Sequence, residues 1–176
     1  SKVYSFSNAP GKLGVTDANG NSEALELPGA EYIYGVCENG DTLAVLAGAD
    51  PLFFAGTDDE QSVQASGDDG HAIYLYDETG HLTGSIPLAE RCADAPYALD
   101  SDGTDYFILF SDAAVRVGSD GTQLAKSGDM GGRLLQLACA DGAVYVCVEG
   151  DRIYQTEKVV RLNAQTLEPE AELSCA

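Results

Sequence analysis

The residues best suited to bind a metal ion lie between about Ala47 and Gly70, in the stretch AGADPLFFAGTDDEQSVQASGDDG. This is the one long irregular connection that the sequence predicts, and long loops on a rigid scaffold commonly carry binding sites. Oxygen ligands at this density could hold Ca²⁺, although their spacing matches no EF-hand loop. A solvated acidic loop held to the core by Leu52, Phe53 and Phe54 explains the same residues. The candidate Ca²⁺ ligands are five acidic residues: Asp58, Asp59, Glu60, Asp68 and Asp69.

Catalytic side chains form no comparable pattern. His71 and His81 are the only histidines, on either side of a predicted turn at 77–80, and no motif marks a Ser or Cys nucleophile beside them. The five cysteines include no Cys-x-x-Cys pair, so zinc and thioredoxin-like sites lack support. The residues therefore give no positive indication of an enzyme, and we expect the cysteines to serve as small apolar side chains.

Cys139 and Cys147 flank a predicted hairpin whose turn is Asp-Gly at 141–142. With this turn Cys139 lies opposite Val144, and Cys147 lies opposite Gln136. The two thiols then lie on opposite faces of the hairpin. We predict that they do not form a disulfide with each other.

The balance of charges limits the partners of this chain. Nine Lys and Arg residues stand against 29 Asp and Glu residues, which gives a net charge of -20. Such a surface repels nucleic acid and anionic lipid, and the most apolar unbroken stretch, at 106–110, is far shorter than the ~20 residues of a spanning helix. We therefore expect neither nucleic-acid binding nor membrane insertion. An acidic, glycine-rich domain with few lysines suits an extracellular or cell-surface protein.

The elements that must position these residues are predicted to be short β-strands. Apolar or alternating runs recur between Asn-Gly, Asp-Gly and similar dipeptides, which is typical of consecutive hairpins, and helical periodicity is nearly absent. About fifteen strands follow from this pattern, including Ala24 to Leu27 and Pro96 to Leu99. The predicted fold class is therefore all-β.

Two kinds of hairpin alternate along the chain. Inner hairpins have turns at 39–40, 102–103 and 141–142, and outer hairpins have Asp-x-x-Gly or related turns. The step from an outer-turn glycine to the next inner-turn glycine is nearly constant, at 20 positions from Gly20 to Gly40 and 21 from Gly121 to Gly142. Repeats with one rigid joint and one variable loop indicate stacked four-stranded antiparallel meanders.

Two segments carry a resemblance to a known superfamily. IYLYDETGHLTGSIPL from Ile73 and VVRLNAQTLEPEAEL from Val159 resemble the outer halves of blades in β-propellers with NHL-like, YWTD-like or quinoprotein-like repeats. The chain has no Trp, which leaves the subfamily open. The resemblance implies a single β-propeller-like domain or propeller fragment of just under four blades over residues 1–176. Its units are a partial one at about 1–29 and fuller ones at 30–88, 95–128 and 133–174.

An array of this size leaves three arrangements open. The chain could form a compact ring of four blades, it could be a fragment of a larger propeller that is completed by the remaining blades of a longer chain, or two chains could share one ring as a homodimer. In a propeller, the strands that begin each unit start at the same rim as the long insertion. The candidate ligand-binding residues at that rim are Tyr32, Tyr34, Tyr97, Arg133 and His71, and packing in the core is the alternative role for each tyrosine.

The functional hypothesis follows from the repeat architecture. We expect a non-enzymatic binding or scaffold propeller domain, extracellular, that contacts a protein or a carbohydrate. The alternative is an accessory part of a secreted hydrolase or lyase whose active site lies partly outside this chain. No cofactor is expected apart from the candidate Ca²⁺.

Overall fold

A computed structural model of the chain describes residues 3–7, 12–25, 27–28, 30, 32–48, 71–88, 96–152 and 155–175. All regular secondary structure within these ranges is β, and no helix there is long and apolar enough to cross a bilayer. The fifteen strands are β1 (Val3–Ser7), β2 (Lys12–Thr16), β3 (Ser22–Leu25), β4 (Tyr32–Asn39), β5 (Thr42–Gly48), β6 (Ala72–Tyr76), β7 (Leu82–Pro87), β8 (Ala98–Ser101), β9 (Tyr106–Leu109), β10 (Ala114–Val117), β11 (Gln123–Lys126), β12 (Leu134–Ala140), β13 (Ala143–Glu149), β14 (Thr156–Asn163) and β15 (Pro169–Ser174). The prediction of an all-β fold is confirmed.

The strands form four antiparallel sheets, each a meander in which neighbours in sequence are neighbours in space. The first sheet contains β1 to β3, the second β4 to β7, the third β8 to β11 and the fourth β12 to β15. The second, third and fourth sheets begin with strands that contact one another, since β8 contacts both β4 and β12. We call β4, β8 and β12 the inner strands.

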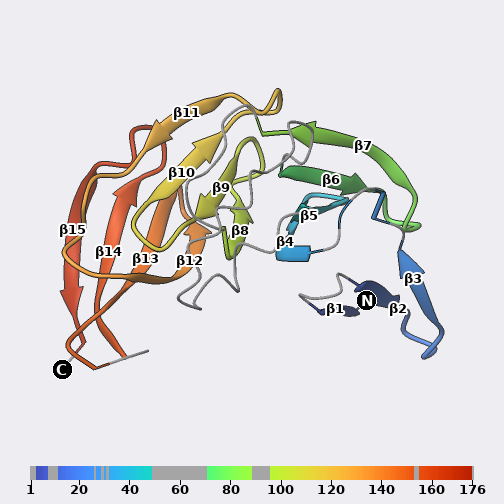
Figure 1. Ribbon diagram of the computed structural model, residues 1–176, viewed down its shortest axis with the longest axis horizontal. Helices are drawn as coiled ribbons and strands as arrows, with labels where there is room; N and C mark the ends of the chain where they lie inside the picture. Colours follow the sequence, from blue (N-terminus) through green and yellow to red (C-terminus); the bar gives the residue numbers. More distant parts are fainter. Residues whose placement is uncertain are drawn as a thin grey trace, which may run out of the picture.

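Three apolar cores join the sheets in order. One core lies between the first and second sheets and includes Leu13 and Val45, and another, between the second and third sheets, includes Leu46 and Ile108. The third and fourth sheets share a core that includes Leu109 and other fully buried side chains. The four sheets therefore stand face to face in an open arc, with the first sheet at one end and the fourth at the other (Figure 1).

Short local turns explain why the sheets are meanders. In the outer hairpins, the Asp17 and Asp77 carboxylates accept backbone N–H bonds from the residues two and four positions later, at 2.8 to 3.0 Å. Each turn ends on a glycine with positive φ, Gly20 at 85° and Gly80 at 86°. Aspartate favours such turns because its side chain replaces a backbone acceptor, and glycine accepts the left-handed conformation without strain.

Two glycines allow the sheets to approach one another closely. A Cβ atom on Gly35 of β4 would lie 2.6 Å from the backbone nitrogen of Leu99, so this residue sets the spacing between two inner strands. A Cβ atom on Gly121, in the outer turn of the third sheet, would lie 1.9 Å from the carbonyl oxygen of Pro87 in the second sheet. Only glycine fits at either place.

Some strand boundaries differ from the sequence-based ones. The strand expected at Pro96 to Leu99 is β8 at Ala98–Ser101, and the strand expected at Ala24 to Leu27 is β3 at Ser22–Leu25. Each strand includes polar residues that its apolar pattern did not mark, because strand pairing depends on the backbone and not on the hydropathy of the side chain. Asp100, for example, pairs with Phe107.

The cross-strand neighbours of Cys139 and Cys147 agree with the prediction. Cys139 lies opposite Val144, Cys147 lies opposite Gln136, and both thiols are free.

Candidate functional site

A cleft of about 650 Å³ lies between a turn of the third sheet and the link that leads from the third sheet to the fourth. One wall is the turn from β9 to β10 at Ser111–Ala113, and the other is the link from β11 to β12. We call this the rim cleft, lined by Ser111, Asp112, Ala113, Lys126, Ser127, Gly128, Asp129, Gly131, Gly132 and Arg133. Its volume lies within the range of roughly 300–1,000 Å³ that is usual for ligand sites.

The walls of the rim cleft are held by buried groups. The Ser127 backbone nitrogen donates to the Ala114 carbonyl, and the Ala114 nitrogen donates in return to the Ser127 hydroxyl, both at 2.9 Å. Met130 is buried in the core between the third and fourth sheets, which anchors the link between the two walls. The Leu134 nitrogen donates to the Ser111 carbonyl at 2.9 Å and joins the two walls directly. The rim cleft is therefore built on a rigid frame.

Charged groups of both signs are exposed around the rim cleft. Lys126 and Arg133 contribute two of the chain's nine basic residues, and Asp112 and Asp129 face the same space. The Asp129 carboxylate also accepts the Gly131 backbone N–H at 2.8 Å, which shapes the link. Such a surface offers cations, carboxylates and glycine backbone groups to a polar ligand.

Two of the residues predicted to bind ligand lie against each other in the second sheet. The rings of Tyr34 and His71 meet edge to face, with centroids 5.0 Å apart and an interplanar angle of 61°. Both are buried, and His71 packs over Gly48, where a Cβ atom would lie 3.0 Å from the His71 Cδ2 atom. Tyr34 also belongs to the core between the second and third sheets.

The other three predicted residues lie at separate places along the array. Tyr32 is half-buried against the core between the second and third sheets. Tyr97 is half-buried against the core between the third and fourth sheets. Arg133 is exposed in the rim cleft, where its carbonyl accepts the Glu149 backbone N–H at 2.7 Å. The structure thus places one of the five candidates in the rim cleft.

The candidate Ca²⁺ ligands Asp58, Asp59, Glu60, Asp68 and Asp69 lie outside the described residues. Within the described ranges, no group of three or more His, Cys, Asp or Glu side chains is placed to hold a metal ion. The calcium hypothesis for the loop therefore stays a prediction.

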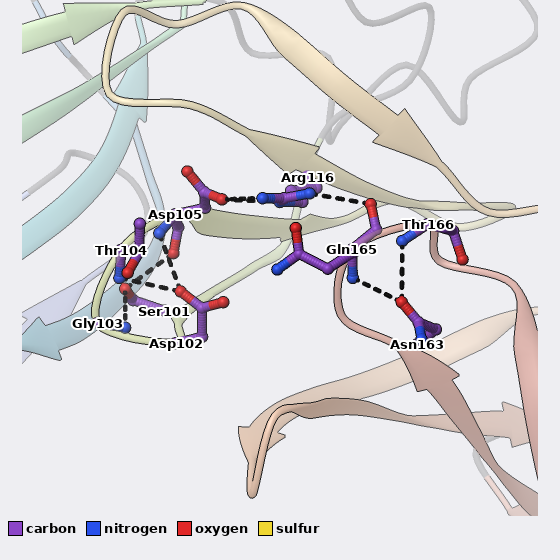
Figure 2. Close-up of polar contacts among 9 residues, drawn as sticks. All are labelled: Ser101, Asp102, Gly103, Thr104, Asp105, Arg116, Asn163, Gln165 and Thr166. Atoms are coloured by element: carbon purple, nitrogen blue, oxygen red, sulfur yellow. Dashed lines mark hydrogen bonds and ion pairs between the residues drawn. The ribbon is translucent and has the colours of Figure 1, made fainter.

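A second polar network joins the third and fourth sheets through their turns (Figure 2). Arg116 of β10 donates from Nε to Asp105 Oδ2 at 2.7 Å, and it donates from another guanidinium nitrogen to the Gln165 carbonyl at 2.9 Å. The Arg116 and Asp105 side chains are only 14% and 10% exposed. Through Arg116, this network connects the inner turn of the third sheet to the outer turn of the fourth, so its position indicates a structural role.

The inner strands meet at Asp100. Its carboxylate accepts the Cys139 backbone N–H at 2.7 Å, which joins β8 to β12. Burial, with a further contribution from the Asp100 charge, raises the pKa of the Cys37 thiol to about 12 and also raises the pKa of Cys139. Both thiols therefore stay protonated at neutral pH, which does not suit a nucleophile.

Sequence reasoning missed most of the rim cleft. It selected Arg133 but not Lys126, Asp129 or the glycines of the segment KSGDMGG at 126–132. The available signal was a glycine-rich link containing a lysine, in a chain with few basic residues. A link of that composition exposes backbone groups and cannot contribute a strand of its own.

Comparisons with known proteins concern the fold alone. No protein-family model matches the sequence, and no curated protein matches it. Solved structures do match. A computationally designed protein called Ika8 has 10% identity over 97% of this chain, with a TM-score of 0.56. BamB from Moraxella catarrhalis has 11% identity over 99%, with a TM-score of 0.55, and the WD40 β-propeller domain of Doa1 has 10% identity over 98%, with a TM-score of 0.59.

The chain spans about half the length of these matched structures, covering 48% of the Ika8 chain and 50% of the BamB and Doa1 chains. The second, third and fourth sheets have the four-stranded antiparallel order expected of propeller blades, and the first sheet has three strands. This chain has the β-propeller fold, in the form of an open array of four sheets.

Proposed function

We propose that this chain is a non-enzymatic binding domain that holds a protein ligand in the rim cleft, and that it acts outside the cell. The observation that carries the proposal is the rim cleft itself, a space of about 650 Å³ between a turn of the third sheet and the link to the fourth, with exposed charges of both signs. Propeller sheets supply a rigid frame on which connecting loops present ligand groups. The acidic composition supports the extracellular location.

The charges on the rim cleft favour a polypeptide. Lys126 and Arg133 lie beside Asp112 and Asp129, so a segment with both acidic and basic side chains finds partners of opposite sign. Most of the remaining surface repels acidic segments because the net charge is -20. An acidic side chain on the ligand is therefore directed towards Lys126 and Arg133.

A phage-displayed peptide library, selected on the whole chain, provides the test. We expect the selected peptides to bind at least about tenfold more weakly to a Lys126→Ala variant, the loss of one charge-assisted contact. A Lys158→Ala variant serves as the control, because Lys158 is paired with Glu172 in the fourth sheet and lies outside the rim cleft. Peptides that bind both variants equally would place the preferred surface elsewhere. Binding to a glycan panel, with no peptide selected, would instead identify a carbohydrate-binding domain.

The hypothesis of an accessory part of a secreted hydrolase or lyase stays a prediction. Its test is turnover of a glycan panel by a longer protein that contains this domain.

A further inference from the structure

Two Asn-Gly pairs lie at turns of this chain, at 19–20 and 39–40. At such a pair the asparagine can lose its side-chain amide without an enzyme. The glycine nitrogen attacks the Asn Cγ atom, the C–N bond of the amide breaks, and the amide nitrogen leaves as ammonia with the proton of the glycine N–H. Water then opens the resulting succinimide ring at either carbonyl, which yields isoaspartate or aspartate and one new negative charge. Glycine permits the attack because it has no Cβ atom to hinder it.

The turn around Asn19 holds the attacking nitrogen. The Gly20 N–H donates to the Asp17 carbonyl at 3.1 Å, and the Asn19 N–H donates to the Asp17 carboxylate at 2.8 Å. The same carboxylate accepts bonds from the Asn21 backbone and side chain, each at 2.9 Å. Attack by the Gly20 nitrogen therefore requires the hydrogen bonds of this turn to break.

The turn at Asn39 differs, because none of the described residues accepts a hydrogen bond from the Gly40 N–H. Asn39 ends β4 and pairs with Thr42, so the turn consists of Gly40 and Asp41. Gly40 is exposed, and nothing lies within 4 Å of the position that a Cβ atom would take there. The Gly40 nitrogen can therefore move towards the Asn39 side chain without displacing a neighbour.

One contact restrains the side chain of Asn39. Its Nδ2 atom donates to the hydroxyl of Tyr106 in β9 at 3.3 Å, which is longer than the usual N–H···O distance. Tyr106 is 4% exposed, so this contact joins the inner turn of the second sheet to the third sheet. Isoaspartate moves one carbon from the side chain into the backbone of the turn and has a carboxylate in place of the amide. Tyr106 then loses the donor that Asn39 supplies.

We propose that Asn39 is a site of spontaneous deamidation in the folded protein, and that the fold suppresses the same reaction at Asn19. Both sites are Asn-Gly pairs, and the hydrogen bonds of the two turns set the difference in rate. The product at position 39 adds a carboxylate beside Glu38 and Asp41 and weakens the contact between the second and third sheets. The proposal is independent of the ligand in the rim cleft, because Asn39 does not line that cleft.

The test is incubation of the whole chain at pH 8, with peptide mass spectrometry of the two Asn-Gly pairs over time. We expect deamidation at Asn39 to be at least about fivefold faster than at Asn19, the factor that one hydrogen bond on the attacking nitrogen supplies. In concentrated urea the two rates should become nearly equal. Equal rates in the folded protein, or faster reaction at Asn19, would overturn the proposal. A ratio that urea leaves unchanged would also overturn it, because the local sequence would then set the rates.

Two variants separate the causes. Asp17→Ala removes the carboxylate that orders the turn at 17–21, so it should raise the rate at Asn19 at least about fivefold and leave the rate at Asn39 unchanged. Tyr106→Phe removes the acceptor of the Asn39 amide but keeps the aromatic ring in the core, so it should raise the rate at Asn39 alone. An unchanged rate at Asn19 in Asp17→Ala would refute suppression by this turn.

Discussion

Removal of the guanidinium of Arg116 should be the most costly single change among the ion pairs described. In Arg116→Met, the Asp105 carboxylate, 10% exposed, loses two hydrogen bonds and its counter-charge, and the Gln165 carbonyl loses a donor. Loss of one partner of a buried pair costs about 3–5 kcal/mol, because the remaining charge is desolvated without compensation. Since Asp105 keeps a little contact with water, we expect a loss of about 3 kcal/mol.

Arg161→Met is the matched control. Arg161 pairs with Glu170 on the fourth sheet, but these side chains are 41% and 34% exposed. Water already solvates this pair, so its loss should cost no more than about 1 kcal/mol. The same substitution in two environments therefore separates burial from the chemistry of arginine.

Urea unfolding at pH 7, followed by circular dichroism, measures both variants. The comparison requires a single transition with an unchanged m-value, because an array of sheets can lose cooperativity. Added 0.5 M salt should leave the cost of Arg116→Met nearly unchanged, since buried pairs are screened less than exposed ones. Equal costs for the two variants would refute the reasoning, because burial would then make no difference.

Three further predictions concern other contacts. Gly121→Ala should lower the free energy of unfolding by at least about 2 kcal/mol more than Gly103→Ala does, because both glycines have positive φ but only a Cβ atom at position 121 meets a carbonyl oxygen. Equal urea midpoints for the two variants would contradict this. At pH 8 iodoacetamide should alkylate the exposed Cys175 at least about tenfold faster than Cys37, because burial raises the pKa of the Cys37 thiol to about 12. Peptide mass spectrometry measures both rates. Equal rates would show that Cys37 is not buried. Hydrogen bonds lower the pKa of Asp77, so the difference in unfolding free energy between the wild type and Asp77→Asn should be constant between pH 5 and 7 and should shrink as pH falls below about 4. If the two urea midpoints differed at pH 3 by as much as they do at pH 7, the result would argue against this prediction.

The sign of the Asp77 prediction follows from proton linkage. The folded pKa of this carboxyl lies below the unfolded one, because the Thr79 side chain and then the His81 backbone N–H donate to the charged form. The stabilisation is therefore present above the unfolded pKa and is lost as pH falls through the folded pKa.

The sequence by itself determined the local part of this fold. The turns at Asp17 and Asp77 form because a carboxylate and a glycine a few residues apart satisfy the backbone without help from distant residues. The hairpin at 141–142 likewise sets the faces of Cys139 and Cys147, since turn length fixes the register. Those features, and with them the repeat of four-stranded meanders, could be predicted.

Only the tertiary structure decided how the sheets meet. The rim cleft requires a turn of the third sheet, at 111–113, to lie beside the link to the fourth sheet, at 126–133, and the Asp105–Arg116–Gln165 network joins residues up to 60 positions apart. The candidate ligand residues Tyr32, Tyr34 and Tyr97 share a residue type and lie at or near the start of an inner strand, yet they pack against cores between different pairs of sheets. Local turn chemistry cannot specify these contacts, because they depend on the distance and twist between packed sheets, which long-range close packing sets.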